Sequence, residues 1–76
     1  MTNTSMLKEA IKRSGIKANA IMQALGIKAY ATLRGKINNE SEFTAKEIMI
    51  LSDLLRLTIS DRDAIFFAET AEYHSA

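Results

Sequence analysis

The chain has 76 residues, with no cysteine, no proline and a single histidine. A domain of this length buries only a small core, and the lack of cysteine excludes a disulfide framework or a thiolate metal site. The net charge of +1 hides an asymmetry: residues 1–38 carry seven Lys or Arg and one Glu, a net +6, whereas residues 39–76 carry three cations and eight acids, a net −5. This segregation indicates one half that faces a polyanion and one that avoids it.

The first two predicted helices cover about residues 5–14 and 18–25. Apolar residues recur at helical spacing in both, and they assign the inner faces to Leu7, Ala10, Ile11 and Ser14, and to Ala20, Ile21, Ala24 and Leu25. Gly15 and Gly26 are expected to end these helices, Gly26 with positive φ. Ile27 should fill the turn that follows.

The third predicted helix covers about residues 29–38. Tyr30, Leu33 and Ile37 share one face, which is expected to pack inward. The opposite face and its shoulder carry Ala31, Thr32, Arg34, Gly35, Lys36 and Asn38. Gly35 inside a helix costs about 1 kcal/mol against alanine, a loss that makes sense where the backbone approaches another surface closely. Tyr30 has two interpretations, a core residue or a hydroxyl that emerges toward a phosphate.

The acidic half predicts two more helices after a polar loop, over about residues 45–56 and 60–72. Thr44 and Glu47 form a capping box, bracketed by Phe43 and Ile48 as a hydrophobic staple. The fifth helix has two possible capping boxes, Thr58 with Asp61 and Ser60 with Asp63. Its large apolar residues cannot all face one core, so one side should meet the first helix or a second subunit.

The sequence contains few residues that could form a catalytic or metal-binding site. His74 is the only histidine, most acids lie at helix starts where they cap, and no glycine-rich phosphate loop is present. We therefore expect no enzyme, no metal and no cofactor. The N-terminal residues lack the pattern of a secretory signal, and no apolar run approaches the ~20 residues of a membrane span, so a cytoplasmic protein is expected.

The stretch SGIKANAIMQALGIKAYATLRGKINNESEFTAKEI resembles the small phage Cro/CI-type regulators of the lambda-repressor-like helix-turn-helix superfamily, above all the Cro-like proteins of phages of Gram-positive bacteria. The resemblance covers about residues 6–70. Its motifs lie at Gly15, at Ile21 and Leu25–Ile27, at Leu33, Lys36–Asn38 and Ser41–Thr44, and at Leu55, Leu57–Thr58 and Arg62–Ala68. It implies one all-α domain over residues 1–76, with a helix-turn-helix at the second and third helices, acting as a transcription regulator in the cytoplasm of a bacterial host.

The resemblance further implies that the third helix enters the major groove of a palindromic double-stranded DNA operator. The expected base-contacting residues are Lys28, Tyr30, Ala31, Thr32, Arg34 and Gly35. The expected phosphate-contacting residues are Lys17, Asn19, Gln23, Lys36 and Asn38. The interval from Gly26 to Leu33 is one residue longer than the family spacing, which leaves Lys28, Ala29 and Tyr30 as alternatives for the first base contact.

A homodimer on DNA is expected, because one recognition helix reads only a few base pairs. Phe66, Phe67 and Tyr73 are the predicted interface residues, since the acidic half should face away from phosphate. The alternative function is a protein-interaction module, for example an antirepressor that binds a phage repressor. In that case Phe66 or Phe67 would matter more than the basic residues.

Overall fold

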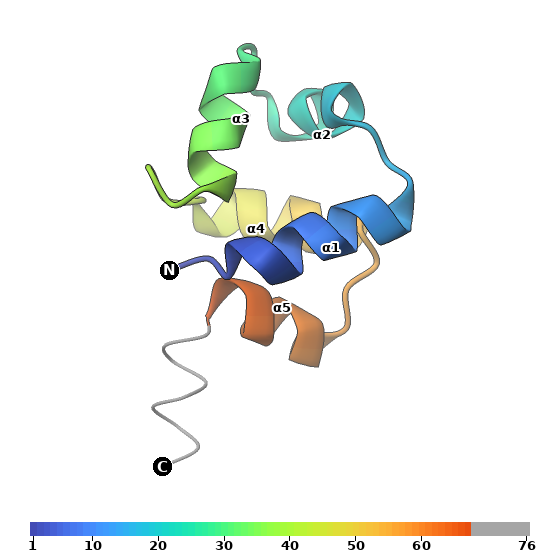
Figure 1. Ribbon diagram of the computed structural model, residues 1–76. Helices are drawn as coiled ribbons and strands as arrows, with labels where there is room; N and C mark the ends of the chain where they lie inside the picture. Colours follow the sequence, from blue (N-terminus) through green and yellow to red (C-terminus); the bar gives the residue numbers. More distant parts are fainter. Residues whose placement is uncertain (68–76) are drawn as a thin grey trace.

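The computed structural model describes residues 1–67, which form five α-helices (Figure 1). They are α1 (Thr4–Ser14), α2 (Ala18–Leu25), α3 (Tyr30–Ile37), α4 (Ala45–Leu54) and α5 (Ile59–Phe66). No strand occurs in this part of the chain, so the all-α prediction is confirmed. α1 packs on α3 and α5, and α2 packs on α3 and α4. None of these helices is both long and apolar enough to cross a membrane.

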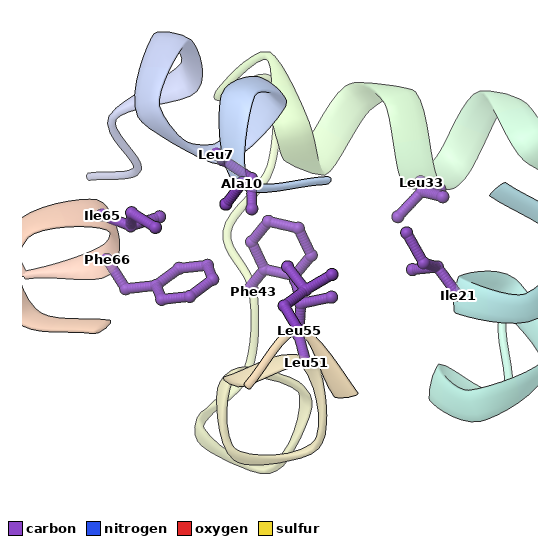
Figure 2. Packing of buried hydrophobic residues seen from close by; sticks show 9 residues of the cluster. All are labelled: Leu7, Ala10, Ile21, Leu33, Phe43, Leu51, Leu55, Ile65 and Phe66. Carbon is purple, nitrogen blue, oxygen red and sulfur yellow. The ribbon is translucent and has the colours of Figure 1, made fainter. Parts of the chain in front are cut away.

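The core is a single cluster to which all five helices and the segment before α4 contribute (Figure 2). Phe43 lies between the side chains of α1, α4 and α5 and meets the Phe66 ring edge-on, with 5.6 Å between the ring centroids. Leu33 is the only fully buried residue of α3 and faces Ile21 of α2. The expected inward face of α1 is confirmed, and α5 meets α1 as one of the two alternatives foresaw.

Two sequence predictions about inward faces and one about an interface residue are wrong. In α2, Ala20 and Ala24 are exposed, and the residues that pack around buried Ile21 are Ala18, Met22 and Leu25. Of the two interpretations of Tyr30, the core residue is wrong, because this first residue of α3 is 55% exposed. Phe66 is buried against Phe43 and is therefore a core residue rather than an interface residue.

The remaining interface predictions are Phe67 and Tyr73. Phe67 is 37% exposed. The guanidinium of Arg62 lies 5.9 Å from the centroid of the Phe67 ring. Tyr73 lies outside the described residues, as does the part of the predicted fifth helix beyond residue 67.

Side-chain caps decide where α4 and α5 begin. The Thr44 hydroxyl accepts from the Glu47 N–H at 3.1 Å, and the Glu47 carboxylate accepts from the Thr44 N–H at 2.9 Å, which confirms the predicted capping box. Of the two boxes possible for α5, the structure uses Thr58 with Asp61. α4 ends at Leu54, earlier than predicted, because Arg56 adopts a left-handed conformation with φ 54°.

The end of α3 is held by an asparagine in a conformation that usually requires glycine. Asn39 has φ 66°, and the Glu40 N–H donates to the Gly35 carbonyl at 2.8 Å, as in a Schellman motif. The Asn39 side chain accepts from the Thr2 N–H at 2.9 Å and donates to the Thr2 carbonyl at 2.6 Å. It therefore ties the N-terminal segment to the end of α3.

We predict that Asn39→Ala lowers the free energy of unfolding by about 2 kcal/mol. The substitution removes the side-chain hydrogen bonds to Thr2, and alanine is less stable than asparagine in the left-handed conformation. Asn39→Gly should recover about 1 kcal/mol of this loss. Urea denaturation measures both values. Asn38→Ala is the control, because the Asn38 side chain makes no hydrogen bond within residues 1–67; an equal loss in that variant would contradict the role of Asn39.

Candidate nucleic-acid interface

The outer face of α3 is open to solvent. Ala31, Thr32, Arg34 and Asn38 are exposed, while Leu33 on the opposite side is 1% exposed. Burial of Leu33 fixes the rotation of the helix about its axis, so the four exposed residues point away from the core. Their predicted common face is therefore confirmed as a surface, whereas contact with DNA stays a prediction.

A groove of about 300 Å³ runs beside this face, between α1 and α3. Its apolar lining comes from Ile11, Ala18, Ile21, Leu33 and Ile37. Its polar lining comes from Lys8, Lys12, Tyr30, Arg34 and Asn38, and no acidic residue of the described chain lines it. The groove therefore offers cations and hydrogen-bond donors to an anionic partner.

The structure adds Lys8 and Lys12 to the candidate site, two residues that the sequence reasoning counted only toward the charge of the basic half. They lie one helical turn apart on α1 and share the groove with Arg34 of α3. Arg13, their neighbour in sequence, lines a different hollow with Asp61 and Ile65 on the α5 side of α1. The i, i+4 spacing of Lys8 and Lys12 was the signal for this common face.

The starts of α2 and α3 differ from those of the other three helices. Side chains of Asn3, Thr44 and Thr58 cap α1, α4 and α5. The N-cap residues of α2 and α3 are Lys17 and Ala29, neither of which provides a side-chain cap, and neither helix has an acid in its first turn. Their first backbone N–H groups and the positive end of each helix dipole are thus available to an anion.

Lysines accompany both of these uncapped starts. Lys17 is itself the N-cap residue of α2, and Lys28 is exposed in the turn immediately before Ala29. The turn is set by Gly26, which ends α2 with φ 72°, and by the Ile27 N–H, which donates to the Met22 carbonyl at 2.9 Å. Ile27 packs against the core, as expected. α3 then begins at Tyr30, with Ala29 as its N-cap residue.

Two predicted site residues, Gly35 and Gln23, do not line the groove that contains Arg34. Gly35 is half-buried, and a Cβ at its position would make an ordinary contact with the Glu40 side chain at 3.8 Å, so its contact with DNA stays a prediction. Gln23 lines a hollow with Thr44 and Lys46 at the start of α4, apart from the groove that contains Arg34. Asn19, by contrast, is exposed in the first turn of α2, beside Lys17.

Lys36, predicted to contact phosphate, has an intramolecular partner instead. Its ammonium donates to the Glu47 carboxylate at 3.0 Å and to the Glu42 carbonyl at 3.0 Å, and it lies 5.9 Å from the Phe43 ring centroid. The Lys36 side chain is only 14% exposed. Burial alone would raise the pKa of Glu47, but hydrogen bonds from Thr44 and Lys36 and the charge of Lys36 hold this pKa below its ordinary value.

No metal-binding cluster of His, Asp or Glu occurs within residues 1–67. Comparisons with protein-family models, with curated proteins and with solved structures find no match to the chain. Function therefore has to be inferred from the geometry and charge of the surface around α3.

The Lys36–Glu47 pair predicts a pH dependence of stability. The pKa of Glu47 is lowered on folding from its ordinary 4.5, so its contribution is complete above about pH 4.5 and is lost as the pH falls through the lowered value. Wild type should exceed Glu47→Gln in free energy of unfolding by about 1 kcal/mol at pH 7, and the difference should shrink at acid pH. Denaturant titrations across pH 2–7 measure it.

Glu42→Gln is the matched control for this measurement. The Glu42 side chain makes no hydrogen bond within the described residues, and only its backbone carbonyl accepts from Lys36. Its substitution should change stability by less than about 0.5 kcal/mol at any pH. A difference between wild type and Glu47→Gln that stays constant down to pH 2 would contradict the ion pair.

Proposed function

We propose that the protein is a sequence-specific transcriptional regulator that binds double-stranded DNA, with α2 and α3 acting as a helix-turn-helix of the lambda-repressor-like type. The observation that carries the proposal is the pair of uncapped starts of α2 and α3, each accompanied by a lysine. A helix start without its own carboxylate or hydroxyl cap is suited to receive a phosphate.

The exposed face of α3 supplies side chains suited to base edges in the major groove. Arg34 can donate two hydrogen bonds to guanine O6 and N7, a pairing worth about 1–3 kcal/mol of discrimination. Ala31 and Thr32 offer methyl groups to the methyl group of thymine. Exposure of all three on one side of the helix supports this role. Lys28 and Tyr30, at the start of the same helix, complete the proposed base-contacting set.

Backbone phosphates would be bound on both sides of α3. Lys17 and Asn19 lie at the start of α2, and Lys8 and Lys12 lie across the groove on α1. Asn38 lies at the other end of α3, also in the groove lining. We leave Lys36 out of this set because its ammonium is bound to Glu47. The proposed DNA-binding surface is therefore built from α1, α2 and α3, the basic half of the chain.

The alternative, a module that binds a repressor protein, depends on exposed apolar side chains rather than on cations. Phe66 does not support this alternative as a contact residue, because its side chain is buried in the core. Binding of operator DNA in a gel shift, against co-purification with a phage repressor, separates the two functions.

The proposal predicts a salt-dependent, sequence-selective affinity for duplex DNA. A preferred duplex is first selected from a random-sequence pool, and its affinity is then measured by fluorescence anisotropy. With about five phosphate contacts per subunit, the slope of log K against log salt should lie between about −4 and −5. Arg34→Ala should weaken binding to the selected duplex by about 10- to 100-fold and reduce the preference over a scrambled duplex.

Arg13→Ala is the matched control, since Arg13 belongs to the same basic half but lies on the α5 side of α1. It removes the same charge and should leave the sequence preference unchanged. If Arg34→Ala keeps the full preference, the assignment of the α3 face is wrong.

The start of α3 allows stability and binding to be separated. Ala29→Ser and Ala29→Asp both supply the missing N-cap, so each should raise the free energy of unfolding by about 1 kcal/mol. Ala29→Asp should nevertheless weaken DNA binding at least ~10-fold, because its carboxylate occupies the end of α3 that faces the anion, whereas Ala29→Ser should bind within a few-fold of wild type. Thermal denaturation and anisotropy measure the two effects; unimpaired binding by Ala29→Asp would exclude this helix start from the interface.

A further inference from the structure

An apolar surface without a partner lies between α4 and the start of α5. Met49 and Ile59 are 70% and 71% exposed, the highest values among the large hydrophobic residues of the described chain. Both line the same hollow, which has a volume of about 580 Å³. Ile50 and Leu57 add further apolar lining, so these two exposed residues form one surface rather than two isolated ones.

Three of the polar residues in this surface lack a side-chain partner within residues 1–67. The Ser52 hydroxyl is buried and makes no hydrogen bond within residues 1–67. Asp53 and Arg56 line the same hollow, and both are exposed and form no ion pair in that part of the chain. Asp53 lies in the last turn of α4 and Arg56 follows the end of that helix, and the two carry opposite charges. Arg62 lines the hollow as well, but its guanidinium is paired with Asp63 at 3.0 Å. The surface therefore presents an apolar centre beside one acid and one base that have no ion-pair partner within residues 1–67.

We propose that this α4–α5 surface, lined by Met49, Asp53, Arg56 and Ile59, binds a second copy of the same chain around a two-fold axis. In a two-fold interface residue i of one subunit meets residue j of the other, and j meets i in return. A surface with one acid and one base is complementary to itself under this operation: Asp53 pairs with Arg56 of the other copy, twice. The apolar residues are buried between the two pairs.

The position of the surface agrees with a role in DNA binding, and in this respect the inference rests on the proposed function. None of the residues proposed to contact DNA lines the hollow. Association through α4 and α5 would leave α3 of both copies free to contact one duplex. The interface differs from the one expected from sequence, because Phe66 is in the core and Phe67 does not line this surface.

Sedimentation equilibrium of the full chain without DNA tests the apolar part of the interface. Wild type should form dimers with a dissociation constant below about 100 µM. Met49→Gln and Ile59→Ser should each raise that constant at least ~10-fold, with an unchanged circular dichroism spectrum because both side chains are exposed in the monomer. Met6→Gln, at an exposed site on α1, is the matched control and should dimerise like wild type.

An exchange of charges tests the two-fold pairing itself. Asp53→Lys alone brings the introduced lysine against Arg56 of the other copy, and Arg56→Asp alone brings the introduced aspartate against Asp53 of the other copy. Each like-charge contact occurs twice, so each variant should dimerise at least ~10-fold more weakly than wild type. In a mixture of the two variants, the heterodimer has two contacts between opposite charges. One contact pairs the introduced lysine with the introduced aspartate, and the other pairs the native Arg56 with the native Asp53. The mixture should therefore contain more dimer than either variant alone at the same total concentration.

Three results would overturn the proposal: a wild-type chain that stays monomeric up to about 500 µM, apolar variants that dimerise like wild type, or a mixture with no more dimer than its components. A wild-type monomer that still binds the selected duplex would leave the proposed function standing. A dimer of the predicted kind with no affinity for DNA would leave the interface standing and overturn the function.

Discussion

The position of α3 depends on the interaction of Lys36 with Glu47. This eight-residue helix has one fully buried side chain, Leu33, and one partly buried side chain, Ile37, that packs against the core. Glu47 closes the capping box of α4 and at the same time binds the ammonium of Lys36, so the start of one helix fixes the end of another. Asn39 adds a second attachment, to the N-terminal segment. With its C-terminal end held in this way, α3 presents its N-terminal half to solvent.

The helices and their boundaries could largely be predicted because local signals determine them. Thr44 and Glu47 are three residues apart, and Gly26 stops α2 with the positive φ expected of it. The partner of Lys36 could not be predicted, because eleven residues separate it from Glu47 and only the packing of α3 near α4 brings them together. The role of Asn39 was hidden for a related reason: asparagine replaces the glycine that normally marks a left-handed helix end.

For the candidate site, periodicity predicted the exposed face of α3 but not its neighbours. The orientation of Arg34 follows from its position in sequence relative to Leu33, which is a local relation. The addition of Lys8 and Lys12 depends on how α1 crosses α3, which no local pattern specifies. Tyr30 shows the same limit, because its position in the sequence left a core residue and an exposed hydroxyl as alternatives, and the structure shows that it is exposed.

The two surfaces of the molecule have different chemistry. Around α3 the surface combines cations with helix starts that no side chain caps, and each missing cap lowers stability by about 1 kcal/mol in a domain whose core is small. Around α4 and α5 it is apolar, with one acid and one arginine that are unpaired within the described residues, and with Arg62, whose charge is paired with Asp63. An anionic partner at the first surface and a second copy of the chain at the other account for both. The division follows the separation of basic and acidic halves in the sequence.

The most direct measurement of the central claim is the change in backbone amide NMR shifts when duplex DNA is added to the protein. We predict that the largest changes occur at residues 17–19 and 28–34, with smaller ones at Lys8 and Lys12, and that the amides of Met49 and Ile59 hardly move. Changes centred on α4 and α5, or no change at a DNA concentration well above that of the protein, would contradict the assignment of the DNA-binding surface to α1, α2 and α3.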